Sequence, residues 1–150
     1  MVGSDVNYLV KWWLMKKQMS DKELAYVLLR LVIGINIYMH GAIRVITGIG
    51  EFVDKISGGF KDTPVPMWVA RGFAWPLPFI EIVLGALLLL GLFMRQTVAA
   101  CLVLIAVLTF GTTIKQDWSG AGSLLVYALV FFVLLAFREW NRFSVDDRRG

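Results

Sequence analysis

The sequence contains one cysteine, Cys101, and one histidine, His40, among 150 residues. A single cysteine excludes a disulfide or a CxxC redox pair within the chain, and we expect Cys101 to be a small buried residue. A single histidine excludes haem held between two histidines of this chain. The sequence also lacks a GxGxxG pattern, a P-loop, a CxxCH motif and clustered metal-ligand residues. We therefore expect no metal site, and no cofactor bound tightly by this chain alone.

Charged residues are also scarce, at 17% of the sequence, whereas hydrophobic residues make up 58% and the mean hydropathy is +0.70. A soluble domain of this length has too little interior to bury that much apolar surface, so lipid is the expected solvent. The net charge is +4, and the basic residues flank apolar runs instead of forming a stripe with interleaved aromatic residues. We therefore expect the lipid bilayer and its anionic headgroups as partners, and no nucleic acid.

Four apolar runs occupy residues 24–46, 73–93, 97–114 and 124–140. Each is close to the roughly 17–25 residues that a helix needs to cross a bilayer, and four segments cannot close a β-barrel. The sequence therefore predicts an all-α polytopic membrane protein, a four-transmembrane-helix bundle. We assign residues 24–140 to this domain and residues 1–23 to a cytoplasmic or interfacial arm without a cleavable signal peptide. Residues 141–150 are assigned to a cytoplasmic tail, which we expect to be mobile from Ser144 onward.

The one long connection between predicted spans, residues 47–72, is expected to form an amphipathic outer loop. Apolar residues recur there at helical spacing, at Phe52, Val53, Ile56 and Phe60. Gly58 and Gly59 should end this short helix, and Pro64 and Pro66 should keep the next segment extended. We expect the segment to lie as a lid on the outer surface of the bundle.

The basic residues predict the orientation of the bundle. An even number of spans puts nine of them on one side of the membrane: Lys11, Lys16, Lys17, Lys22, Arg95, Arg138, Arg142, Arg148 and Arg149. The other side keeps five: Arg44, Lys55, Lys61, Arg71 and Lys115. Because positive charge accumulates on the cytoplasmic side, we expect both termini in the cytoplasm of a bacterium or archaeon, with the bundle in its cytoplasmic membrane.

Ionisable residues inside predicted spans are the candidates for function, because they are costly in lipid. Asn36, His40 and Arg44 are each four residues apart in the first span, so they form one polar stripe that rotates by about 40° per step. Glu81 in the second span lies at a similar depth, and we expect it to pair with His40 or Arg44. If Pro76 and the proline at 78 mark the true helix start, Glu81 lies only one turn into its helix.

Two interpretations of this cluster stay open. It is either an interhelical clamp that fixes the register of the bundle or a site that handles protons and binds a quinone headgroup. In the second interpretation Glu81 and His40 are the catalytic candidates, and Arg30, Asn36 and Arg44 bind the quinone or a partner. The side chain of Arg30 either reaches back to the interface or faces inward, and we favour the inward arrangement.

The run at residues 75–95, WPLPFIEIVLGALLLLGLFMR, resembles the DoxX family of small integral membrane proteins. Its pattern is a proline-led second helix with Glu81, then Gly85, Gly91 and Arg95. Other positions similar to that family are Leu28, Leu29, Arg30, Leu31, Met39, His40, Gly41, Arg44, Phe52, Phe60, Thr63, Pro64, Pro66, Thr109, Phe110 and Gly111. The resemblance implies a four-helix inner-membrane protein, and some DoxD-like relatives are membrane subunits of a thiosulfate:quinone oxidoreductase.

The leading hypothesis for function is therefore a membrane subunit of a redox system that presents a polar intramembrane site to quinone or to a partner oxidoreductase. The alternative is a non-enzymatic scaffold or assembly subunit of a larger membrane complex. A small-solute transporter ranks last, because four short spans form a translocation path only with difficulty unless the chain makes a homo-oligomer.

Overall fold

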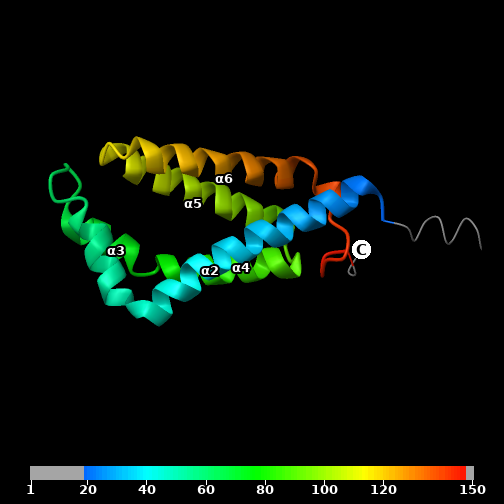
Figure 1. Ribbon diagram of the computed structural model, residues 1–150, viewed down its shortest axis with the longest axis horizontal. Coiled ribbons are helices and arrows are strands. Elements are labelled where there is room, and N and C mark those ends of the chain that lie inside the picture. Colours follow the sequence, from blue (N-terminus) through cyan, green and yellow to red (C-terminus); the bar gives the residue numbers. More distant parts are fainter. Residues whose placement is uncertain (1–18, 148–150) are drawn as a thin grey trace, which may run out of the picture.

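The computed structural model describes residues 19–147, and every regular element in that range is a helix (Figure 1). The elements are α2 (Asp21–Gly58), α3 (Met67–Ala74), α4 (Leu77–Leu90), α5 (Met94–Ile114), α6 (Trp118–Ala136) and the 3-10 helix η1 (Arg138–Trp140). Four helical stretches, with α3 and α4 taken together as Met67–Leu90, are long and apolar enough to cross a membrane. The predicted all-α, four-span fold is confirmed, and the chain is a multi-pass membrane protein. Most of the predicted N-terminal arm lies outside the described residues.

Helix α2 is longer than the predicted first span because it continues through a kink. It begins with a capping box, in which the Glu23 backbone N–H donates to Ser20 Oγ (3.3 Å) and the Ser20 N–H donates to the Glu23 carboxylate (2.8 Å). The kink lies at Gly48, whose φ of 119° is a conformation that residues with a side chain rarely adopt. The predicted short amphipathic helix of the outer loop is therefore present: it is the part of α2 after Gly48, which the kink separates from the preceding part of the helix. It ends at Gly58, as expected.

The second span is divided at Trp75 and Pro76 into α3 and α4. Pro78 lies in the first turn of α4, where its missing N–H is tolerated, so the prediction that prolines mark the start of this helix is confirmed. The fourth span begins earlier than residue 124. Its start is at Trp118, because the Asp117 carboxylate accepts a hydrogen bond from the Gly120 N–H (2.9 Å) and caps the helix.

The helices pack as two antiparallel pairs, α2 with α4 and α5 with α6 (Figure 1). We call the end with the start of α2, the α4–α5 turn and residues 141–147 the tail end, and the end with residues 59–66 and the α5–α6 turn the loop end. The pairs converge toward the tail end and lie further apart toward the loop end (Figure 1). Their shared core is Tyr26, Ile33, Ile37, Leu84, Leu88, Met94, Val98, Cys101, Ile105, Phe131 and Leu134.

The chain after α6 folds back onto the tail end of the bundle, so the expectation of a mobile tail is wrong for residues 144–147. The Val145 N–H donates to the Leu90 carbonyl (3.0 Å), and Ser144 is only 2% exposed. The Asp146 carboxylate accepts hydrogen bonds from the backbone N–H groups of Phe93 (2.9 Å) and Met94 (2.8 Å), at the start of α5. A carboxylate is favoured at the positive end of a helix dipole, and this contact holds the tail in place. Residues 148–150 lie outside the described residues.

Candidate functional site

The candidate site is built around an ion pair between α2 and α4. Glu81 is 5% exposed and lies one turn after the start of α4. Both of its carboxylate oxygens accept hydrogen bonds from Nη1 of Arg44. The expected pairing of Glu81 is therefore confirmed, with Arg44 as its partner. A carboxylate and a guanidinium that face each other offset part of the cost of removing both from water.

His40 joins the pair through the other side of the guanidinium. Its Nδ1 lies 3.3 Å from Nη2 of Arg44. Because a guanidinium can only donate, Nδ1 acts as the acceptor, and the proton of the neutral imidazole is on Nε2. Within residues 19–147 no hydrogen bond to Nε2 is present, and the ring of His40 is exposed. The site therefore presents one oriented N–H donor that no described group uses.

Two aromatic residues complete the cluster. The Tyr127 hydroxyl of α6 donates to Oδ1 of Asn36 (2.8 Å), which connects α2 to the other helix pair. The guanidinium carbon of Arg44 lies 4.6 Å from the centre of the Phe52 ring, just beyond the kink. Sequence reasoning did not assign either residue to this site, although it placed Phe52 in the amphipathic outer segment. A tyrosine inside an otherwise apolar span was the available signal for Tyr127, because its hydroxyl needs a partner there.

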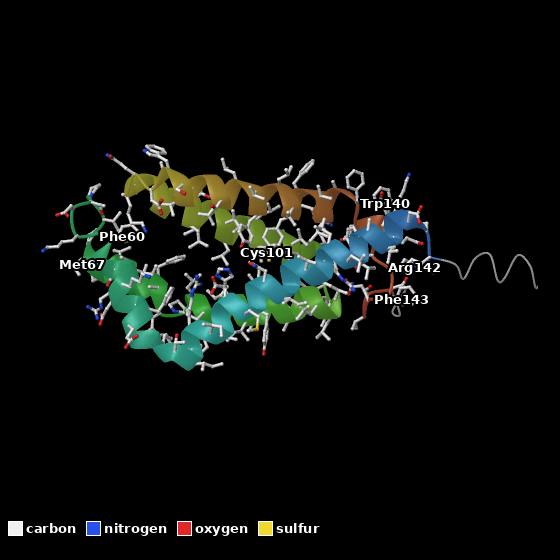
Figure 2. All side chains as sticks on the ribbon, viewed as in Figure 1. Phe60, Met67, Cys101, Trp140, Arg142 and Phe143 are labelled. Carbon is white, nitrogen blue, oxygen red and sulfur yellow. The ribbon has the colours of Figure 1, made fainter. Side chains whose placement is uncertain are left out.

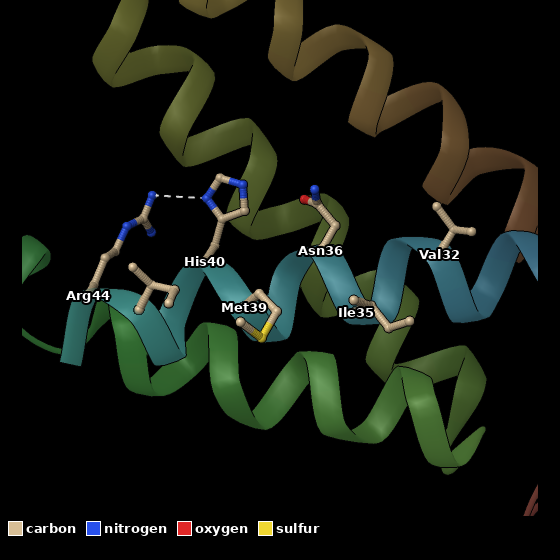
Figure 3. A pocket seen from close by; sticks show the side chains of 7 residues that line it. Val32, Ile35, Asn36, Met39, His40 and Arg44 are labelled. Atoms are coloured by element: carbon tan, nitrogen blue, oxygen red, sulfur yellow. Dashed lines mark hydrogen bonds between the residues drawn. The ribbon is translucent and has the colours of Figure 1, made fainter. Parts of the chain in front are cut away.

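A shallow and largely open hollow of about 550 Å³, which we call the groove, lies along the face of α2 that carries these side chains. It is lined by Val32, Ile35, Asn36, Met39, His40, Ile43 and Arg44. Figure 3 shows Asn36, His40 and Arg44 projecting from the same side of the helix, with the sulfur-bearing side chain of Met39 on the adjoining side. The groove thus combines apolar walls with one polar edge, which is the composition of a site for an amphipathic ligand or a partner helix.

A family model described as methylamine utilisation protein MauE matches residues 22–116, which is more than half of the chain. The chain belongs to the MauE family. No curated protein and no solved structure matches it. The MauE match covers α2 to α5 and thus includes Asn36, His40, Arg44 and Glu81, whereas Tyr127 and the folded-back tail lie beyond it.

The resemblance to DoxX is therefore wrong, since the matching family is MauE. The structure gives a physical reason why the glycine pattern of residues 75–95 does not identify the DoxX family. A Cβ on Gly85 would lie 2.5 Å from the Tyr38 backbone nitrogen, and Gly91 ends α4 with a φ of 63°. Small residues at close helix contacts and left-handed helix ends are general requirements of membrane hairpins, so this pattern does not identify one family. The expectation of thiosulfate chemistry depended on that resemblance and loses its support in a MauE protein.

Arg30 is not part of the cluster in this MauE-family protein. It is 1% exposed and faces inward at the tail end, as favoured from the sequence. Its Nη1 donates to Oδ1 of Asn141 (2.7 Å) and its Nη2 to the Phe143 carbonyl (3.2 Å). The predicted binding role for Arg30 alongside Asn36 and Arg44 thus has no geometric support, because its guanidinium holds the tail. Sequence spacing could not reveal this, since its partners follow more than a hundred residues later.

Cys101 is 2% exposed within the shared core, and Figure 2 shows it in the middle of the bundle. Among the described residues there is no group of three or more His, Cys, Asp or Glu residues that could hold a metal ion. The side chains that the structure gathers around the ion pair are polar groups joined by hydrogen bonds: Asn36, His40, Arg44, Glu81 and Tyr127.

Proposed function

We propose that this protein is a membrane component of a redox system for methylamine utilisation, in the cytoplasmic membrane with both termini in the cytoplasm. In this proposal the cluster of Asn36, His40, Arg44 and Glu81 is presented to a redox ligand within the bilayer, either a quinone or a partner oxidoreductase. The family description supports the process, because the use of methylamine by oxidation requires an electron acceptor. The cluster lies within helices that are long and apolar enough to cross a membrane, which supports a ligand that is itself in the bilayer.

The observation that carries the proposal is the exposed ring of His40. A polar side chain that faces lipid in a membrane span is costly, and such residues normally face a partner, a ligand or water. Here the ring lines a groove, and its Nδ1 is already engaged by Arg44. The oriented Nε2–H is thus available to whatever occupies the groove.

The charge of the cluster favours a neutral headgroup. The carboxylate of Glu81 offsets the guanidinium of Arg44, so little net charge is left to attract an anion. Quinone carbonyls are neutral acceptors that can take a hydrogen bond from the Nε2–H of His40. An imidazole also exchanges protons readily near neutral pH, which quinone reduction requires. Arg44 and Glu81 then act as positioning residues that fix the ring, and Asn36 is fixed by Tyr127.

A second candidate function, a scaffold or assembly subunit, is favoured by the shape of the groove. All seven lining residues come from α2 and recur three or four positions apart, which is the spacing of a helix face that packs against another helix. A partner helix or a second copy of this chain would then cover His40. No observation of comparable weight favours transport.

Growth on methylamine tests the assignment to this process. We expect that deletion of the gene slows growth with methylamine as the nitrogen or carbon source and leaves growth on ammonium and a sugar unchanged. Re-expression of wild type should restore growth, and His40→Ala should fail to do so at equal membrane abundance. Ile46→Ala, at an exposed apolar position of the same helix, is the matched control and should restore growth. Normal methylamine growth of the deletion strain would rule out the proposal.

Photo-crosslinking from the groove separates the two candidate functions. A photoreactive residue at Met39, which lines the groove and is 45% exposed, should label a quinone analogue if the groove is a ligand site. The same residue at Val103, 65% exposed on α5, is the control for general membrane labelling. A stoichiometric crosslink from Met39 alone to a polypeptide that is not an oxidoreductase, or to a second copy of this chain, would instead favour the scaffold function.

A further inference from the structure

A second cavity, of about 290 Å³, lies at the loop end of the bundle. It is lined from four elements and the connecting loop by Ile56, Phe60, Val65, Val69, Ala70, Phe73, Leu77, Val107, Leu108, Phe110, Gly111, Thr112, Ile114 and Lys115. Apart from Thr112 and Lys115 these residues are apolar or glycine, so the cavity suits an aliphatic chain and offers almost nothing to a polar headgroup. The part of α2 after the kink at Gly48 contributes Ile56 to this lining, and Figure 1 shows it turning toward the loop end of α5.

The one charged group at this cavity is the half-buried Lys115. Its Nζ lies 5.1 Å from the centre of the Phe60 ring, which holds the ammonium group beside the cavity. Within residues 19–147 no carboxylate lies at salt-bridge distance from it. The two arginines on this side of the bundle, Arg44 and Arg71, are both paired with carboxylates. Lys115 is therefore a cation at an apolar cavity that no described carboxylate neutralises.

Aromatic residues place this cavity near the membrane interface. Trp68 and Trp118 are 76% and 67% exposed, and they lie at the starts of α3 and α6, next to the loop end. Exposed tryptophan is enriched at the level of the lipid headgroups. Figure 2 shows Phe60 and Met67 at this end, opposite Trp140, Arg142 and Phe143 at the tail end. A lipid phosphate would thus lie at about the depth of Lys115.

We propose that this cavity binds one anionic phospholipid, with an acyl chain among the apolar side chains and the phosphate region at the ammonium group of Lys115. The apolar lining selects the chain, and the unpaired charge selects an anionic headgroup over a zwitterionic one. The proposal does not depend on the redox function, because none of the cavity residues belongs to the cluster around His40.

Two substitutions separate chain binding from headgroup binding. Gly111→Leu places a side chain in the cavity, and a Cβ at this position would meet only the Phe60 ring, at 3.4 Å. Gly122→Leu is its control, because a Cβ there meets nothing within 4 Å. Lys115→Gln removes the charge, and Lys61→Gln, at an exposed residue of the same end, is its control. Val107→Trp is a second cavity-filling variant, for use if Gly111→Leu does not fold.

Native mass spectrometry of the purified full chain, titrated with phosphatidylglycerol or phosphatidylcholine of identical chains, tests the proposal. We expect phosphatidylglycerol to occupy one site about fivefold more tightly, the factor that one lysine near a lipid surface provides. Lys115→Gln should remove this preference, and the cavity-filling variants should remove the site for both lipids, while both controls behave as wild type. Equal binding of the two lipids, retention of the site in both cavity-filling variants, or displacement of the lipid by an isoprenoid quinone would overturn the proposal.

Discussion

At the residue scale, the ion pair between Glu81 and Arg44 connects α4 to α2 next to the groove. The Glu81 side chain is 6% exposed and that of Arg44 is 27% exposed, so the two charges are removed from solvent to different degrees. Arg44 also contacts His40 and Phe52, so its guanidinium takes part in the contacts with Glu81, with the His40 imidazole and with the Phe52 ring. The pair can stabilise the bundle and orient His40 at the same time, and these two roles are separable by substitution.

We expect Glu81→Ala to lower the free energy of unfolding by roughly 3 kcal/mol. This is the lower end of the range for removing one partner of a buried ion pair, because the Arg44 side chain is still partly exposed to solvent. The double variant Glu81→Leu with Arg44→Leu should recover most of that stability, since apolar residues replace both charges. If the ion pair positions His40, this double variant should still fail to restore growth on methylamine. Thermal unfolding in detergent measures the first effect. A double variant that grows like wild type would show that the pair is only a structural clamp.

The sequence predicted this pair because both charges lie on helical faces whose spacing can be counted. The four-residue spacing of Asn36, His40 and Arg44 fixes one stripe, and the depth of Glu81 follows from its distance to the helix start. Tyr127 could not be placed in the same way, because its contact with Asn36 depends on how the two helix pairs cross. The groove could not be predicted from the sequence either, because the packing of α4, α5 and α6 decides which face of α2 stays open.

At the element scale, the crossing of α2 and α4 depends on two glycines that face each other's helix. A Cβ on Gly41 would lie 2.3 Å from the Pro78 carbonyl oxygen, and one on Gly85 would lie 2.5 Å from the Tyr38 nitrogen. Both contacts are with backbone, which cannot move aside as a flexible side chain can. Close backbone approach through small residues is a general way to pack helices in lipid, where water does not drive association.

We expect Gly85→Ala to destabilise the bundle by about 1–3 kcal/mol, the usual cost of overpacking, because the new methyl group forces α4 away from α2. The same substitution at Gly72, where a Cβ meets nothing within 4 Å, should leave stability unchanged. Unfolding in increasing denaturing detergent, followed by circular dichroism, compares the two variants. Equal stability of Gly85→Ala and Gly72→Ala would contradict the close contact between the helices.

Element boundaries were predicted well only where a local signal exists. Gly58 and Pro78 mark the end of α2 and the start of α4 through their own backbone properties. The folded-back tail had no such signal, because charged residues near an apolar span are usually solvated. The Asp146 carboxylate accepts from N–H groups at the start of α5, and the Asp146 N–H donates to the Gly91 carbonyl, so its partners lie far away in the sequence.

At the scale of the whole molecule, the two ends of the bundle differ in structure. The tail end is closed by Asn141, Ser144 and Asp146, whereas the loop end contains the kinked part of α2 and the cavity. The sequence predicts nine of its fifteen lysines and arginines on the side of both termini and five on the other side, and five of those nine lie outside the described residues. Because such asymmetry sets orientation during insertion, the tail end is expected to face the cytoplasm.

Labelling of single cysteines in intact cells tests this orientation. In a Cys101→Ala background, a membrane-impermeant maleimide should label Lys61→Cys at the loop end, and should label Arg95→Cys at the tail end only after the membrane is permeabilised. Both positions are exposed, so access to reagent and not burial decides the result. The opposite labelling pattern would show that the loop end faces the cytoplasm. The lipid at Lys115 would then come from the inner leaflet. Since anionic lipids that attract basic residues lie mainly in the cytoplasmic leaflet of many membranes, that inversion would strengthen the lipid site while it removed the assigned orientation.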